Sequence, residues 1–107
     1  MKKTIEEIDF GKGDGLVPVI VQDINSKEVL TLAYANKESL ALTQKTGNSW
    51  FWSRSRNKLW MKGEESGNTQ KVKEILVDCD SDAIIYLVEP AGPACHTGDR
   101  VCFHNNL

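Results

Sequence analysis

The sequence predicts a compact α+β domain that is rich in strands and has one principal helix. Three observations support this fold class. The chain has 107 residues, of which 40% are hydrophobic and 26% charged, as in an ordinary single globular domain. Most apolar runs are short and bounded by Gly, Asn, Asp or Pro, which is typical of strands. Only residues 37–46 combine an amphipathic pattern with the flanking residues of a helix.

The N-terminal part is expected to contain the first two strands. Residues 4–7 have the spacing of a capping box and predict a short helix. A glycine-punctuated loop follows. Residues 16–24 and 28–35 are predicted strands joined by a turn at 25–27. Pro18 indicates that the first strand begins late or lies at the edge of its sheet.

The principal helix and the remaining strands follow in order. Asn36 is expected to cap the helix at its start, and Gly47 to end it. Residues 64–68 are a polar loop, and residues 90–99 form a second loop. The later strands are predicted at residues 49–53, 58–62, 72–79, 83–89 and 101–103.

Composition and charge exclude several classes of protein. No apolar run approaches the roughly 18 residues that a membrane helix needs, and the N-terminal residues turn acidic without a signal-peptide apolar stretch. We therefore expect a cytoplasmic protein with no membrane partner. The net charge of −2 and an acidic patch make nucleic acid a poor partner.

All three cysteines lie in the C-terminal third, at Cys79, Cys95 and Cys102. Their number is odd and cytosol is reducing, so metal binding or reactivity is favoured over disulfides. The spacing matches no CxxC zinc motif, and buried free cysteines are the alternative. Three ligands would leave one tetrahedral zinc position open, as in catalytic sites. His96, beside a proposed ligand, is the candidate catalytic base, although a lone histidine is more often only hydrogen-bonded.

Three aspartates alternate along the chain at Asp78, Asp80 and Asp82. Grouped carboxylates favour magnesium or calcium, but the Gly and later Glu of an EF-hand loop are missing. In an extended strand the three would spread over about 13 Å, too far for one ion. Aspartate is favoured in turns, so a hairpin turn at residues 80–82 would bring them together. Turn aspartates without a metal are the alternative.

Aromatic residues and arginines alternate in residues 50–56. Trp52 is a candidate surface for stacking on a base, and Arg54, Arg56 and Lys62 are candidates for binding phosphate. A basic stretch beside a metal-like cluster would suit a small phosphorylated substrate. The alternative is an amphipathic strand whose arginines point into solvent.

Together these motifs resemble the phosphoribosyl-AMP cyclohydrolase family of histidine biosynthesis. The resemblance runs from about residue 16 to residue 103, and the cysteine-containing loop combined with the Trp-Ser-Arg-Ser-Arg block is highly specific. The matching stretches are residues 52–60, 62–68, 78–82, 92–98 and 102–103. The chain departs from the family pattern at Glu65, Ser81, Val101 and His104, where Thr, Gly, Ser and an aromatic residue are common.

The resemblance implies hydrolysis of the adenine N1–C6 bond of 1-(5-phosphoribosyl)-AMP by a zinc-activated water. It implies an intertwined homodimer that shares zinc between subunits, with Cys79 from one and Cys95 and Cys102 from the other. Asp78, Asp80 and Asp82 would be magnesium ligands. Many relatives carry a fused pyrophosphohydrolase domain, whereas residues 1–107 are expected to form a single cyclohydrolase domain without one.

Two other functions are alternatives for these motifs. A zinc nucleobase deaminase needs His-x-Glu and Pro-Cys-x-x-Cys, and neither motif occurs in the chain. A non-catalytic, zinc-stabilised binding module is the rival from another class. It predicts a fourth protein ligand on the zinc, either His96 or His104, so the number of zinc ligands separates it from an enzyme.

Overall fold

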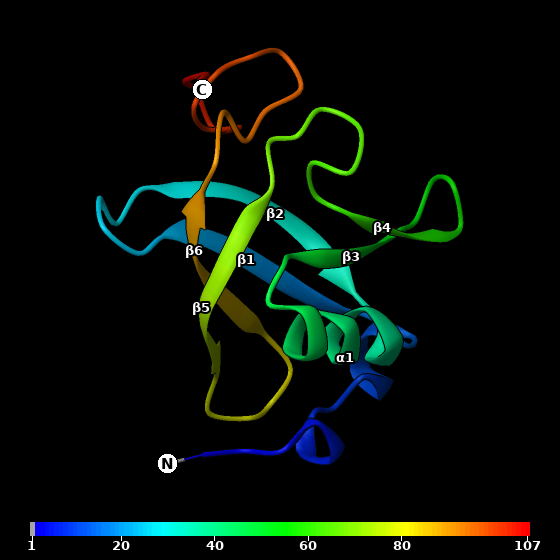
Figure 1. Ribbon diagram of the computed structural model, residues 1–107. Coiled ribbons are helices and arrows are strands. Elements are labelled where there is room, and N and C mark those ends of the chain that lie inside the picture. The colour runs from blue at the N-terminus through cyan, green and yellow to red at the C-terminus, as the bar shows by residue number, and fades with distance from the viewer. Residues whose placement is uncertain (1) are drawn as a thin grey trace.

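The computed structural model describes residues 2–107 and contains, within them, two sheets and one α-helix (Figure 1). Two short 3-10 helices come first, η1 (Ile5–Glu7) and η2 (Gly11–Gly13). The predicted α+β class with one principal helix is confirmed. The further elements are β1 (Val17–Asp23), β2 (Val29–Ala35), α1 (Lys37–Thr46), β3 (Trp50–Ser53), β4 (Lys58–Met61), β5 (Gln70–Val77) and β6 (Ile84–Pro90).

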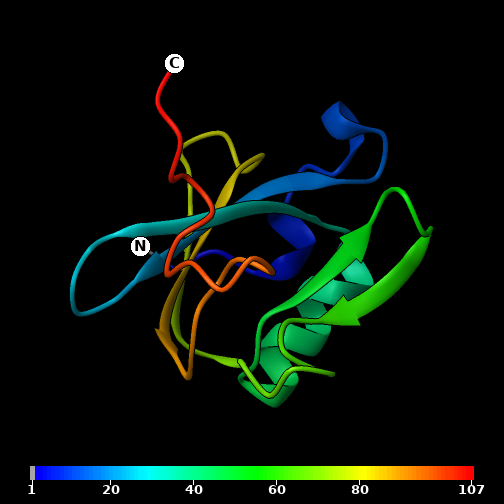
Figure 2. The ribbon, with the colours of Figure 1, turned by 90° about the horizontal axis from the view of Figure 1, so that it is seen from above.

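The larger sheet has the strand order β2-β1-β6-β5. β1 is antiparallel to β2 but parallel to β6, with Val19 opposite Ile84, and β5 is antiparallel to β6. β3 and β4 form a separate hairpin. Seen from above, this hairpin and α1 lie to one side of the larger sheet (Figure 2).

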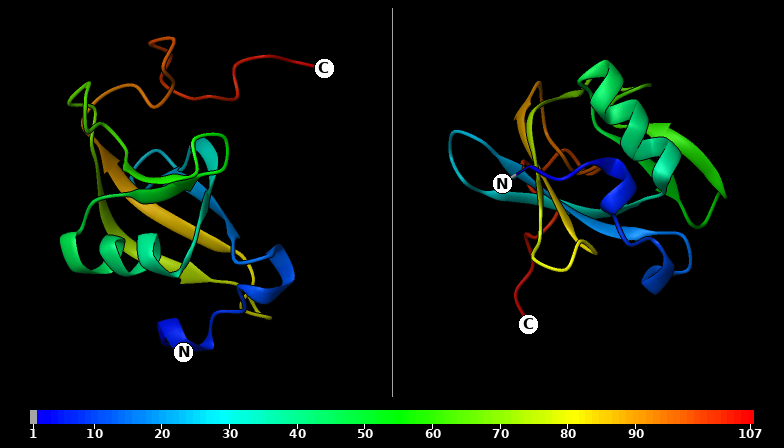
Figure 3. Two further views of the ribbon diagram at one scale, coloured as in Figure 1. Left: turned by 90° about the vertical axis from the view of Figure 1, so that its right-hand side faces the viewer. Right: turned by 90° about the horizontal axis from the view of Figure 1, so that it is seen from below.

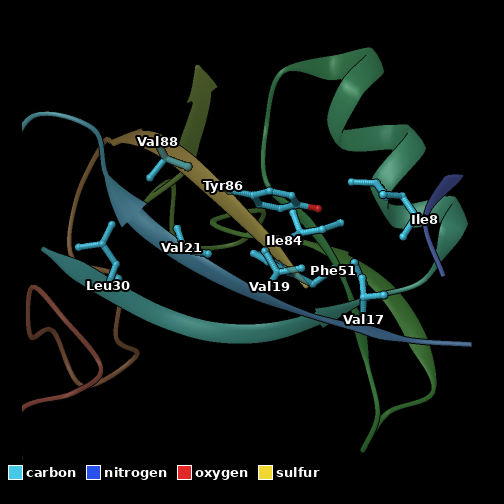
Figure 4. Close-up of a cluster of buried hydrophobic side chains, with 12 residues drawn as sticks. Ile8, Val17, Val19, Val21, Leu30, Phe51, Ile84, Tyr86 and Val88 are labelled. Carbon is cyan, nitrogen blue, oxygen red and sulfur yellow. The ribbon is translucent and has the colours of Figure 1, made fainter. Parts of the chain in front are cut away.

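The core lies between the larger sheet and the β3 and α1 elements that pack beside it (Figure 4). Alternate residues of β1 are buried, as the period of a half-buried strand requires. Phe51 of β3 packs against Tyr86 of β6, with ring centroids 5.6 Å apart. The Tyr86 hydroxyl lies 3.2 Å from that of Thr43 in α1. These contacts fix the small hairpin and the helix against the sheet.

Helix α1 begins and ends where the sequence indicates. The Asn36 side chain accepts a hydrogen bond from the Ser39 N–H at 2.8 Å, and the Ser39 hydroxyl accepts one from the Asn36 N–H at 2.9 Å. This reciprocal pair is a capping box. Gly47 ends the helix with a φ of 78°, a left-handed conformation that suits glycine.

The predicted short N-terminal helix forms as the 3-10 helix η1, but Thr4 makes no capping bond with its side chain. The predicted edge position of β1 is wrong, because β1 pairs with both β2 and β6. Its pairing with β6 starts late, at Val19, so Pro18 needs no N–H on that side. Residues 101–103 form no strand. A single backbone bond, from the Cys102 N–H to the Leu30 carbonyl at 2.7 Å, holds that segment.

The two segments with candidate metal ligands lie at opposite ends of the molecule (Figure 3). The acidic turn, residues 78–82, joins β5 to β6 beside the N-terminal segment. The cysteine loop, residues 91–102, follows β6 at the other end. None of the helices in residues 2–107 is long and apolar enough to span a membrane.

Candidate metal and substrate sites

The acidic turn brings the three predicted aspartates together. Carboxylate oxygens of Asp78, Asp80 and Asp82 lie within 4.8 Å of one another. Asp78 makes the turn itself, because its Oδ1 accepts hydrogen bonds from the N–H groups of Asp82 at 2.9 Å and Ala83 at 3.1 Å. The predicted hairpin between the flanking strands is confirmed. Three convergent carboxylates are a donor set that fits magnesium.

Lys12 lies against this turn. Its Nζ is 3.1 Å from Oδ2 of both Asp80 and Asp82, and these hydrogen bonds raise the pKa of Lys12 to about 12. Hydrogen bonds from Asp82 and then from Lys12 lower the pKa of Asp80 to about 2. The lysine ammonium therefore offsets the repulsion among carboxylates that a metal cation would otherwise offset.

A second lysine of the N-terminal segment supports the same turn. Lys3 Nζ donates to the carbonyls of Asp78 at 3.4 Å and Cys79 at 3.3 Å, and also to the Ser81 hydroxyl. The Ser81 carbonyl accepts from the Asp9 N–H at 2.7 Å. Sequence reasoning missed both lysines, because no spacing signal relates residues near the N-terminus to the β5–β6 turn.

The cysteine loop places Cys95 and Cys102 next to each other. Thr97 Oγ1 lies 3.1 Å from Cys95 Sγ and 2.6 Å from Asp99 Oδ2, so these two acceptors share one hydroxyl proton. Bonds from the Thr97 side chain and backbone, and then from His104, lower the pKa of Cys95 to about 6. Burial is the largest influence on Cys102 and raises the pKa of its thiol, which the neighbouring Cys95 raises further. A thiol that is ionised at neutral pH beside a second thiol fits zinc.

Cys79 lies in the acidic turn, exposed to solvent, at the other end of β6. The seven residues of β6 extend over roughly 20 Å, so one chain does not bring all three cysteines to a single ion. Within residues 2–107, the aspartates are the one group of three His, Cys, Asp or Glu side chains close enough for a metal. The zinc shared between subunits, which the resemblance implies, stays a prediction.

The two histidines differ in their surroundings. His96 is exposed on the cysteine loop, and its catalytic role stays a prediction. His104 Nε2 lies 3.9 Å from Cys95 Sγ and 3.4 Å from Asp99 Oδ2. Sequence reasoning gave His104 no catalytic role and named it only as a candidate fourth zinc ligand in the rival binding module. The available signal was its position two residues after Cys102, which in extended chain places both side chains on one face.

The predicted substrate residues fall into three places. Trp52 and Arg54 line an open groove of about 550 Å³. The Arg54 guanidinium carbon lies 3.8 Å from the ring centroid of Tyr34, in a cation–π contact. Arg56 lines a separate hollow of about 220 Å³. Lys62 lies close enough to Cys102 for its charge to oppose the effect of burial on that pKa. Trp60 lines both hollows and joins them.

The fold and these sites define a class: a small, β-rich α+β domain whose polar clusters have the donor groups of a metal-dependent enzyme. The family model for phosphoribosyl-AMP cyclohydrolase matches residues 31–104. The chain belongs to the phosphoribosyl-AMP cyclohydrolase family. Membership of this family makes it a hydrolase.

Curated relatives match over the whole chain. A phosphoribosyl-AMP cyclohydrolase of Nitrosopumilus maritimus (strain SCM1) is 80% identical over 100% of this chain and 99% of its own length. One of Cenarchaeum symbiosum (strain A) is 76% identical with the same coverage. A histidine biosynthesis bifunctional protein of Bacillus subtilis (strain 168) is 62% identical over 94% of this chain and 48% of its own length.

Proposed function

We propose that this chain hydrolyses the N1–C6 bond of the adenine ring in phosphoribosyl-AMP, with a zinc-activated water as the nucleophile. The reaction class rests on family membership over the full chain. The observation that carries the mechanism is the thiol pair, in which Cys95 has a pKa of about 6 beside Cys102. A thiolate already formed at neutral pH can bind zinc without losing a proton first.

In this proposal Cys95 and Cys102 of one subunit and Cys79 of a second hold zinc, and the three aspartates of the acidic turn hold magnesium. Zinc supplies an acidified water, and magnesium supplies positive charge for a phosphate group. The 20 Å between the two ends of β6 supports a site shared by two subunits. Three large apolar residues are exposed to solvent: the exposed fractions are 44% for Val29, 44% for Leu32 and 60% for Phe103. They offer apolar surface that a partner subunit would cover.

The remaining side chains bind and orient the substrate. Trp52 provides an aromatic face for the base, and Arg54 and Arg56 provide charge for two phosphate groups from neighbouring hollows. Lys62, whose charge acts on Cys102, binds the phosphate nearest to the thiols. His96 takes a proton from the attacking water or returns one to N1, because imidazole titrates near neutral pH.

A cytoplasmic location belongs to the same proposal. The free thiols of the cysteine loop would serve as metal ligands in a reducing compartment, where disulfides do not compete with zinc for them.

Turnover of phosphoribosyl-AMP tests the proposal. Purified protein is mixed with the substrate, and the ultraviolet change is followed as the purine ring opens, before and after zinc chelation. Activity that disappears on chelation and returns with zinc is expected. Cys95→Ser and Cys102→Ser should lose zinc and turnover together. Full activity in either variant would contradict the assignment of the thiols.

One observation favours a second candidate, a zinc-stabilised binding module without catalysis. His104 Nε2 lies near enough to Cys95 Sγ, at 3.9 Å, to join it on one ion. A closed coordination sphere is typical of structural zinc. Counting sulfur and nitrogen ligands by X-ray absorption on zinc-loaded protein separates the two. Three sulfurs with an exchangeable water support the enzyme, and a fourth protein ligand in folded but inactive protein supports the module.

A further inference from the structure

Arg100 joins the cysteine loop to the hairpin of β1 and β2. Its Nη2 donates to Asp23 Oδ2 at 2.7 Å and to the Ser26 hydroxyl at 3.3 Å. Its Nε donates to Glu28 Oε1. The planar fork of arginine thus contacts three groups on one hairpin turn at once, which a lysine ammonium does not reproduce.

The anchor of this contact is buried and rigid. Asp23 is only 4% exposed, and its Oδ1 accepts hydrogen bonds from the N–H groups of Asn25 at 2.8 Å and Ser26 at 3.2 Å. A buried carboxylate needs a compensating partner. Exposed ion pairs contribute little to structure, but this pair joins the exposed Arg100 to a carboxylate that is buried and held by two backbone hydrogen bonds.

The backbone of the cysteine loop connects Arg100 to the two cysteines. Arg100 stands between the two cysteines, and its carbonyl accepts a hydrogen bond from the N–H of Ala94, the residue before Cys95, at 3.2 Å. Two residues later, the Cys102 N–H donates to the Leu30 carbonyl at 2.7 Å. Cys95 is therefore tied to Arg100 through Ala94, and Cys102, two residues after Arg100, is tied to β2 by its own backbone bond.

We propose that Arg100 is a positioning residue that holds Cys95 and Cys102 in the arrangement that binds metal. This inference rests on the zinc site of the proposed function. Groups that orient metal ligands from behind typically change metal affinity 10- to 100-fold when they are replaced.

Two measurements on reduced, full-length protein test the inference. Amide hydrogen exchange at Ala94 and Cys102, without metal, reports the anchoring of the loop, and competition with a chelator of known strength reports zinc affinity. In Arg100→Gln both amides are expected to exchange at least about tenfold faster, while the Tyr86 amide of β6 does not change. Zinc affinity should fall about 10- to 100-fold.

The controls separate anchoring from general stability. Lys37→Gln removes an exposed ion pair with Glu6 and should leave both readouts at wild-type values. Arg100→Lys keeps the positive charge but not the planar guanidinium. Its amide exchange rates and its zinc affinity should lie between those of wild type and Arg100→Gln. If Arg100→Gln does not fold, amide exchange at Ala94 and Cys102 and zinc affinity are compared between wild type and Arg100→Lys instead.

Three outcomes would overturn the inference. Unchanged exchange at Ala94 and Cys102 in folded Arg100→Gln removes the anchoring role. If the two amides of Arg100→Gln exchange faster but its zinc affinity equals that of wild type, Arg100 anchors the loop without a role in metal binding. Wild-type protein that binds no zinc through its thiols would overturn the proposed function and this inference together, and that result is distinct because it does not depend on the variant.

Discussion

At the scale of single residues, Thr97 lowers the pKa of Cys95. Its Oγ1 lies 3.1 Å from the sulfur, and this hydrogen bond is the largest cause that lowers the pKa of Cys95 to about 6. Asp99 Oδ2, at 2.6 Å, competes for the same hydroxyl proton. A hydrogen bond to the charged form favours that form. Without the hydroxyl, the thiol should stay protonated to a higher pH.

Thr97→Val is therefore expected to raise the pKa of Cys95 by about one unit or more. The measurement is the rate of Cys95 alkylation against pH in metal-free protein, followed by mass spectrometry. In wild type the rate should fall to half of its high-pH value near pH 6. An identical midpoint in Thr97→Val would show that the hydroxyl does not stabilise the thiolate.

Asp23 makes folding sensitive to acid. Burial opposes its charged form, but hydrogen bonds from the backbone of Asn25 and Ser26 and the charge of Arg100 outweigh burial and lower its pKa. A carboxyl with a lowered folded-state pKa stabilises the fold above its unfolded pKa, near 3.9. That contribution is lost as the pH falls through the folded-state pKa.

Asp23→Asn should cost about 2 kcal/mol of unfolding free energy at pH 7, because the Arg100 guanidinium loses its charged acceptor and keeps only a weaker hydrogen bond to a neutral amide. The variant should also lose less stability than wild type between pH 5 and about pH 2. Urea unfolding at several pH values measures both effects. Parallel stability curves for the two proteins would contradict this account of Asp23.

At the scale of elements, the 3-10 helix η2 places the Lys12 ammonium against the acidic turn. Since Lys12 Nζ bonds Asp80 and Asp82 at 3.1 Å each, a divalent cation at the turn must displace it. Lys12→Gln should lower the melting temperature of the metal-free protein, because the carboxylates then repel one another. Magnesium affinity should become roughly five- to tenfold tighter.

The measurement for Lys12→Gln is the melting temperature across a magnesium titration, since a ligand of the native state raises it by mass action. Lys37→Gln, which removes a lysine far along the chain on α1, serves as the matched charge control. Equal magnesium shifts in wild type and Lys12→Gln would mean that the turn does not exchange lysine for metal.

The start of α1 allows a test of the helix prediction. Asn36→Ala removes the side-chain acceptor of the capping box and should cost about 1 kcal/mol. Thr4→Ala is the control, because Thr4 makes no capping bond with its side chain, and it should be neutral. Urea unfolding of both variants compares them, and equal stabilities would contradict the assigned cap.

Local patterns were enough to predict elements whose cause is local. Asn36 and Gly47 mark α1 because capping depends on neighbouring residues. The aspartates predict the hairpin turn because their preference for turns is also local. Ser81, where the family resemblance implies glycine, has a φ of 64°, a conformation that strains most side chains.

At the scale of the whole molecule, the site depends on pairings between distant segments. β1 lies parallel to β6, with Val19 opposite Ile84, and this pairing sets which end of the sheet holds each cysteine. No local pattern reports it. Sequence reasoning also missed the contact of Lys12 with the acidic turn and that of Arg100 with Asp23. The partners in these contacts are separated by at least 68 residues along the chain, so no local pattern indicates them.

The proposed function requires two subunits to combine their cysteines in one zinc site that opens the purine ring. Cys79→Ser and Cys95→Ser should each be inactive alone, because every site of either homodimer lacks one ligand. After the two variants are unfolded and refolded together, half of the dimers are mixed, and one of the two sites in each mixed dimer keeps all three cysteines.

The decisive measurement is turnover of phosphoribosyl-AMP and bound zinc in that refolded mixture. A twofold-symmetric dimer with shared sites predicts recovery of about a quarter of wild-type activity, with zinc recovered in proportion. A mixture as inactive and as poor in zinc as either parent, although mixed dimers are present, would contradict the shared site.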